Sequence, residues 1–163
     1  MTRRIDVGLS RESVQEAIDA LLAYADSIDE RAERATSAIA DEGIESARQQ
    51  LASYPQPFAT GRLAASFRKS RVPGGYEVSN DCDHAAFFEF GTGVRGQRQS
   101  YPYRFPDVGW AYDVNSHGDS GWFYIGDDGA RHWTRGMPSR PFMAPAALRM
   151  RQCSIAKFKA AFR

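Results

Sequence analysis

The sequence predicts an α+β domain in which a long N-terminal helix and a C-terminal helix pack on a small, mainly antiparallel sheet. Only Gly8 and Gly43 occur before residue 60, and the first of the 8 prolines is Pro55. The remaining glycines and prolines separate short apolar and aromatic runs, as in a chain of strands and turns. We therefore expect a single domain over residues 1–163 that is helical in its first third.

The first element is predicted to be a helix over residues 10–52. Ser10 or Ser13 can cap its start, and Ser13 with Glu16 has the spacing of a capping box. Apolar or small side chains recur at alternating steps of four and three residues, at Val14, Ile18, Leu21, Ala25, Ile28, Ala32, Ala35 and Ile39. Unbroken, this helix would be about 60 Å long. We expect it either to break near Gly43 or to project and pack on a neighbour, and its alanines favour a helix covering a sheet over a coiled coil.

Residues 58–93 are predicted to begin with a short helix and a hairpin. The short helix comprises one or two turns after Thr60. The strands are Phe67–Val72 and Tyr76–Asn80, with Pro73-Gly74-Gly75 as the turn between them. This hairpin supplies two strands of the expected sheet.

The next segment is apolar, Ala85–Phe90, and glycines follow it in Gly91-Thr92-Gly93. Residues 94–133 form an insert that we expect to be a long loop followed by a third strand of the sheet, Trp122–Ile125. The last segment, residues 134–163, contains a second helix.

The C-terminal helix is expected from Pro145, which suits a first helical turn, to Phe162. From Arg149 to Arg163 the chain has five basic residues and no acidic one. A solvated helix face is the usual reason for such a pattern, and contact with nucleic acid is the alternative.

The net charge of +1 conceals an asymmetry. Residues 1–55 hold 11 acids and 6 bases, whereas residues 56–163 hold 9 acids and 15 bases. This asymmetry favours either head-to-tail contacts between copies or pairing within one chain.

Apolar runs of transmembrane length and a signal-peptide pattern are missing, so we expect no membrane contact and synthesis in the cytoplasm. Cys82 and Cys153 are expected to be free thiols.

Two places have residue types that could carry chemistry. Asp81, Cys82, Asp83 and His84 gather four potential metal ligands in one turn, but metal-type spacing does not recur elsewhere, so a polar loop is favoured. Glu89 stands among phenylalanines, where it is either a perturbed catalytic acid or, as we prefer, a carboxylate bound in an ion pair or to backbone amides. Phosphate-loop, dinucleotide and nucleophile-elbow motifs are missing. We therefore predict no catalytic residue, no metal and no cofactor.

The insert has the composition of a protein interface, since it is rich in tyrosine, tryptophan and arginine. We expect it, together with the N-terminal helix, to make subunit contacts, with its basic residues facing an acidic partner or DNA. The predicted interface residues are Arg95, Arg98, Tyr101, Tyr103, Arg104, Phe105, Trp110 and Tyr112.

Four segments in order carry a family resemblance. They are Gly61-Arg62-Leu63-Ala64-Ala65-Ser66, Gly75-Tyr76-Glu77-Val78-Ser79-Asn80, His84-Ala85-Ala86-Phe87-Phe88-Glu89-Phe90-Gly91-Thr92 and Thr134-Arg135-Gly136-Met137-Pro138-Ser139-Arg140-Pro141-Phe142-Met143-Ala144-Pro145-Ala146. Together they resemble the gene-product-ten-like tail-component family of tailed bacteriophages, which are small neck, head–tail joining or tail-completion proteins. His84 stands where this family typically has tyrosine, and the insert is longer than usual.

The resemblance implies a structural virion protein without enzymatic activity, made in the host cytoplasm and assembled into a ring of six or twelve copies at the neck or tail end. Its implied partners are other copies of itself and phage head-completion, tail-terminator or tail-tube proteins, close to packaged DNA. The implied fold-determining residues are Gly61, Leu63, Ser66, Glu89, Gly91, Thr92, Gly136, Pro141, Phe142 and Pro145. The alternatives are a nucleic-acid-binding module using residues 149–163 and a metal-dependent hydrolase centred on Asp83, His84 and Glu89.

Overall fold

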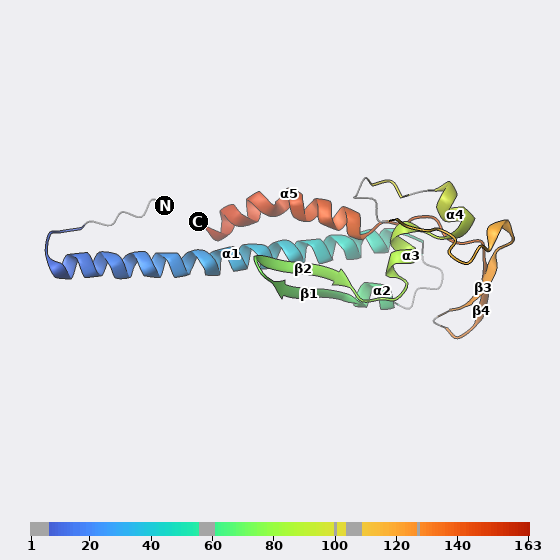
Figure 1. The fold of residues 1–163 in the computed structure, drawn as a ribbon, viewed down its shortest axis with the longest axis horizontal. Coiled ribbons are helices and arrows are strands. Elements are labelled where there is room, and N and C mark those ends of the chain that lie inside the picture. Colours follow the sequence, from blue (N-terminus) through green and yellow to red (C-terminus); the bar gives the residue numbers. More distant parts are fainter. Residues whose placement is uncertain (1–6, 56–60, 100, 104–108, 127) are drawn as a thin grey trace.

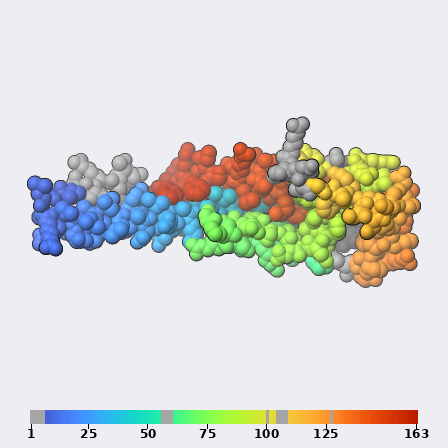
Figure 2. Space-filling view, in the orientation of Figure 1, coloured from blue at the N-terminus to red at the C-terminus, as the bar shows by residue number. Residues whose placement is uncertain are grey.

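The computed structural model describes residues 7–55, 61–99, 101–103, 109–126 and 128–163. Helix α1, Arg11–Ser53, runs along most of an elongated molecule, and helix α5, Met143–Ala161, packs along its second half, while strands β3, Trp122–Ile125, and β4, Arg131–Thr134, lie beyond the C-terminal end of α1 (Figure 1). The expected α+β architecture is confirmed. Of the two alternatives for the long helix, the break near Gly43 is wrong, because α1 is continuous there. Its N-terminal part projects beyond the described body instead (Figure 2).

The start of α1 is fixed by serine side chains. The Ser10 hydroxyl accepts a hydrogen bond from the Ser13 backbone N–H at 3.2 Å, which caps the helix. Ser13 lies inside the first turn, and its own hydroxyl accepts from the Gly8 N–H at 2.7 Å. The cap is therefore Ser10, and the capping box expected at Ser13 is wrong.

The first hairpin is confirmed. Strands β1, Phe67–Val72, and β2, Gly75–Asn80, pair antiparallel with Phe67 opposite Asn80. The hairpin lies against α1, where Lys69 contacts Asp41 at 2.6 Å and Arg71 contacts Glu33 at 2.8 Å. These ion pairs join a basic strand to the acidic helix, so part of the charge asymmetry is satisfied within the chain.

The single sheet that we expected is wrong. Strand β3, Trp122–Ile125, pairs with β4, Arg131–Thr134, which the sequence analysis did not identify. The described residues thus form two separate two-stranded sheets, at different places along the molecule (Figure 1). A local hairpin closes a much shorter loop than a return to β1 and β2 would, so its entropic cost is lower.

Four short helical elements connect these parts among the described residues, and two of them lie where a long loop was expected. They are α2, Arg62–Ala65, α3, Ala85–Phe90, α4, Gly93–Arg98, and the 3₁₀ turn η1, Gly118–Ser120. The apolar segment before Gly91 is a helix, and the beginning of the expected loop is α4. Gly91 separates α3 from α4 with φ +83°, a backbone conformation that favours glycine.

The core lies where α1, α5, α2 and β1 meet, and it is small. Its buried residues are Ala47, Leu51, Leu63, Phe67, Cys82, Phe142 and Ala146. The Phe142 ring is fully buried and lies edge-on to Phe67 and Phe88, at centroid distances of 5.9 and 6.3 Å. Burying such a side chain contributes about 1.5–3 kcal/mol. Both cysteines are free thiols.

Candidate functional site

The best-defined polar centre is the carboxylate of Glu89, on α3. Its side chain is only 4% exposed, and it lies at the start of α5. One oxygen, Oε2, accepts from the backbone N–H groups of Phe142 at 2.6 Å and Met143 at 2.8 Å. The other, Oε1, accepts from the Ala144 N–H at 3.0 Å and the Tyr101 hydroxyl at 2.9 Å. Glu89 is thus bound to backbone amides, as we expected from the sequence.

This carboxylate caps α5 from a distant part of the chain. Phe142, the N-cap residue of α5, makes no capping bond with its own side chain. The first N–H groups of a helix have no partner inside it, and they attract negative charge. Glu89 accepts hydrogen bonds from three backbone N–H groups at the start of α5, those of Phe142, Met143 and Ala144. The next residue is Pro145, which has no backbone N–H that would need an acceptor. The first turn of α5 is therefore fully paired.

Tyr101 completes this centre and links it to an aromatic cluster. Its ring lies 4.9 Å from that of Phe90 and 5.7 Å from that of Tyr103. Burial, together with the adjacent Glu89 charge, raises the pKa of the Tyr101 hydroxyl above its ordinary value. The hydroxyl therefore remains a hydrogen-bond donor throughout the physiological pH range.

The segment after Glu89 is joined to the segment before α5 by the backbone. The Thr92 N–H donates to the Met137 carbonyl at 2.9 Å, and the Met137 N–H donates back to the Thr92 carbonyl at 3.1 Å. A Cβ at Gly91 would lie 2.7 Å from the Ser139 nitrogen, and one at Gly136 would overlap the Thr92 carbonyl. These two positions require glycine because the two backbones touch.

The other motif residues also have structural positions. Leu63 is in the core, and its carbonyl accepts from the Asn80 side chain at 2.9 Å. Ser66 donates to the Arg62 carbonyl at 2.7 Å, and Gly61 begins α2 with φ +79°. The Pro141 carbonyl accepts from the Tyr54 hydroxyl at 3.0 Å, which ties the end of α1 to the start of α5.

The predicted aromatic interface residues lie half-buried against their own chain. Trp110 donates through Nε1 to the Gly91 carbonyl at 2.9 Å, and its ring lies 5.1 Å from that of Phe90. The Tyr112 carbonyl accepts from Gly93 at 2.6 Å. Trp110 and Tyr112 thus fasten the insert to α3 and α4. Arg104 and Phe105 lie outside the described residues.

The predicted basic interface residues Arg95 and Arg98, on α4, are brought together with a third arginine. They line a surface hollow of about 440 Å³ with Gln99, Pro138 and Arg140. Arg140 also donates to the Pro55 carbonyl at 3.1 Å. The hollow is open and cationic, and its chemistry suits an acidic surface.

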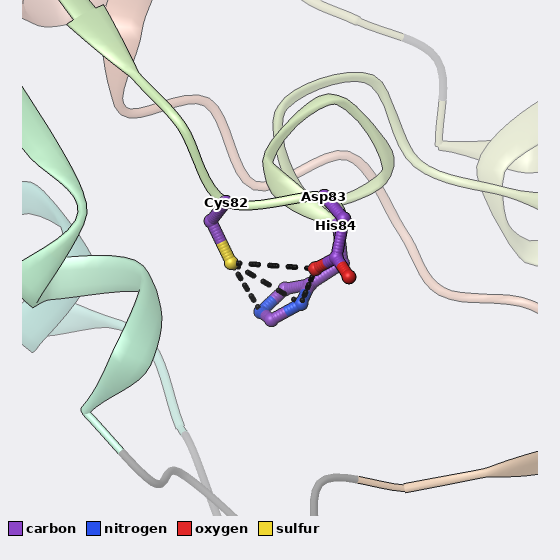
Figure 3. A group of neighbouring side chains, drawn as sticks. All are labelled: Cys82, Asp83 and His84. Carbon is purple, nitrogen blue, oxygen red and sulfur yellow. Dashed lines mark hydrogen bonds and ion pairs between the residues drawn. The ribbon is translucent and has the colours of Figure 1, made fainter.

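Cys82, Asp83 and His84 bring three possible metal ligands together (Figure 3). The Cys82 sulfur lies 3.3 Å from both nitrogens of the His84 ring. A sulfur equidistant from the two nitrogens lies along neither of their lone pairs, because these point in different directions. Asp83 also contacts Arg62 at 3.4 Å, and that positive charge lowers the pKa of the carboxyl. The arrangement is that of a hydrogen-bonded turn, and coordination would require the ring to rotate.

The basic C-terminal helix is partly neutralised within the chain. Arg149 and Lys157 both contact Glu42 of α1, at 2.6 and 3.0 Å. These contacts lower the pKa of the Glu42 carboxyl. Two of the five bases therefore serve the joint between α1 and α5.

More apolar surface stays uncovered among the described residues than the sequence indicated. Along the projecting part of α1 large hydrophobic side chains are exposed, among them Ile18 at 45% and Leu21 at 56%. Their spacing was visible in the sequence, but how far α5 reaches along α1 was not. The described helices include none with a stretch apolar and long enough to cross a bilayer.

Comparisons with family models, curated proteins and solved structures find no match to this chain.

Proposed function

We propose that this chain is a structural virion protein of a tailed phage or prophage, which forms part of the head–tail neck or completes the tail end through ring-like oligomerisation. Its proposed partners are other copies of itself and phage head-completion, tail-terminator or tail-tube proteins. The proposal rests on the four ordered motif segments and on what their residues do in the fold.

The observation that carries the proposal is the projecting part of α1. A helix that extends beyond its own core with large apolar side chains exposed is characteristic of a subunit whose partner surface is supplied by another molecule. The cationic hollow between α4 and Arg140 offers a second contact, suited to an acidic partner ring or to DNA.

The motif residues support a structural role rather than catalysis. Both oxygens of Glu89 are used to cap α5 and hold Tyr101, so this carboxylate is not presented to Asp83 and His84. The hydrolase alternative loses one of its three residues. The nucleic-acid alternative is weakened because Glu42 engages Arg149 and Lys157.

The test is assembly with the phage's own proteins. The purified chain would be mixed with the head-completion, tail-terminator and tail-tube proteins of the same phage, and the mass of each complex measured by light scattering. Entry into a complex containing six or twelve copies supports the proposal. A chain that stays monomeric with all of them, yet retards DNA at low salt, would overturn it in favour of the nucleic-acid module.

A further inference from the structure

The projecting part of α1, residues 11–30, carries an apolar face without cover from described residues. We call this face the α1 stripe; its members are Val14, Ile18, Leu21, Ala25 and Ile28. The large ones are 37–56% exposed. The same helix face continues through Ala35, which is 1% exposed, to Gly43, where Met150 of α5 packs on it. The α1 stripe is thus the uncovered continuation of a face that already binds a helix.

Helix α5 has a second face that is partly apolar, with three large hydrophobic side chains separated by Gln152 and Lys159, and most of it lies opposite the face that packs on α1. We call it the α5 stripe; its members are Leu148, Gln152, Ile155, Lys159 and Phe162. Leu148, Ile155 and Phe162 are 41%, 69% and 36% exposed. Met150 and Lys157, which contact α1, lie on the other side of the helix. Leu148 and Ile155 therefore face away from their own α1, whereas Phe162, at the end of the stripe, also lies beneath the Arg31 guanidinium of α1, 6.0 Å from the ring centroid.

The two stripes match in length and spacing. Each follows alternating steps of four and three residues, the pattern by which helices pack side by side. Each spans 15 residues, from 14 to 28 and from 148 to 162, and its first and last residues are about 21 Å apart along the helix axis. Leu21 and Ile155 are their midpoints.

Charge selects which stripes can pair. Residues 11–30 contain six acids and one base, whereas residues 148–163 contain five bases and no acid. Arg149 and Lys157 already contact Glu42 of the same chain, so Arg151, Lys159 and Arg163 carry the charge of the α5 stripe. Two α1 stripes or two α5 stripes would bring like charges together, whereas a mixed pair brings opposite charges together. Asp26 and Asp29 flank the last part of the α1 stripe, and Arg151 flanks the α5 stripe.

We propose that the α5 stripe of one copy docks on the α1 stripe of the next copy. This inference rests on the proposed function, to which it adds the two surfaces of the subunit contact. The contact uses two different faces, so each copy has one of each to offer. Repetition of such a head-to-tail contact gives a closed ring when the rotation between copies permits it.

Disulfide trapping tests the contact at its centre. Both chains carry Cys82→Ala and Cys153→Ser; one also carries Leu21→Cys and the other Ile155→Cys. The two midpoints meet whether the helices run parallel or antiparallel. Oxidation of the mixture, both at high concentration and with the phage partners present, is expected to give a cross-linked pair that neither variant gives alone.

The control replaces Leu21→Cys with Glu77→Cys, an exposed position on β2. Equal cross-linking of this control would show random collision and overturn the inference. Cross-linking of the Leu21→Cys chain to itself would show that α1 pairs with α1, and it would also overturn the inference. So would the absence of a cross-link both at high concentration and with the phage partners present. If the chain still enters the neck complex, the proposed function survives that failure.

Charge reversal provides an independent test without cysteines. Asp26→Lys with Asp29→Lys is expected to weaken association about tenfold, and a partner copy carrying Arg151→Glu with Lys159→Glu is expected to restore it. Glu77→Lys with Asp119→Lys makes the same change in charge away from both stripes. An equal effect of this control, or no rescue by the partner copy, would overturn the inference.

Discussion

Met150 occupies the space that a side chain at Gly43 would need. A Cβ at Gly43 would lie 2.5 Å from the Met150 sulfur and 2.7 Å from its Cγ, at the place where α5 crosses α1. Glycine therefore allows close contact between two helices, at a position where its low helix propensity would otherwise be a disadvantage.

Replacement of Gly43 by leucine is expected to destabilise the chain by about 1–3 kcal/mol, because the new side chain must displace Met150 from a packed contact. Urea unfolding monitored by circular dichroism measures this. Met150→Ala should recover part of the loss, so the double variant should be more stable than additivity predicts. Strict additivity would show that the two residues do not compete for this space.

Loss of the Glu89 carboxylate is expected to be among the most damaging single changes. Glu89→Ala leaves three backbone N–H groups at the start of α5 without their acceptor, and each costs about 1–3 kcal/mol. Glu89→Gln keeps one oxygen and should be less harmful. Glu77→Ala, at an exposed position, should stay within about 0.5 kcal/mol of the parent. The free energies of unfolding of the three variants give the comparison, and a mild Glu89→Ala variant would contradict the capping role.

Tyr101→Phe removes one of the four donors to Glu89 while keeping the ring on Phe90. We expect a loss of about 1.5–3 kcal/mol, since a hydrogen bond to a charged group is broken but the three amides remain. The effect should be smaller in a Glu89→Gln background, where the hydroxyl can bond only to an uncharged amide, and a double-mutant cycle of unfolding free energies measures the difference. If Tyr101→Phe cost as much stability in the Glu89→Gln background as in the parent, the Tyr101 hydroxyl would not act through the Glu89 carboxylate.

Acid is expected to loosen the joint between α1 and α5. The hydrogen bonds and charges of Arg149 and Lys157 lower the pKa of Glu42 below its ordinary value of 4.5. A carboxyl with a lowered folded-state pKa contributes stability that is present above pH 4.5 and is lost as the pH falls through the lowered value. Amide hydrogen exchange in α5 should therefore accelerate as the pH is lowered below about 4.5, after correction for the intrinsic rate. Glu42→Gln should show this acceleration already at neutral pH, and a pH response equal to the parent's would contradict the assignment.

The sequence predicted those elements whose signals are local. Pro73-Gly74-Gly75 between two strand-like runs predicted the first hairpin, and the apolar spacing predicted α1 and α5. The turn signal Asp127-Asp128-Gly129 follows β3 in the sequence, but the second hairpin was missed because β4 is only four residues long and was not identified as a strand. The single sheet was wrong because nothing local in Trp122–Ile125 specifies which strand it pairs with.

The candidate site was predicted in part for the same reason. A glutamate among phenylalanines indicates a carboxylate with polar partners, and amide binding was the preferred alternative. The identity of those amides depends on a contact between residues 53 positions apart, which no spacing rule gives. The aromatic residues of the insert have the composition of an interface, yet Trp110 and Tyr112 are held by their own chain. Composition alone cannot distinguish aromatic residues that contact a partner from those that pack against their own chain.

The joint between Glu89 and the start of α5 also bears on how sequences of this kind can diverge. Together with the pairing of Thr92 and Met137, it closes the insert at its base. Doubling the length of a flexible loop adds only about 0.6 kcal/mol to its closure entropy. The insert can therefore lengthen, shorten or be exchanged during evolution while the two helices and the core stay in register, so that new contacts can be acquired without rebuilding the subunit.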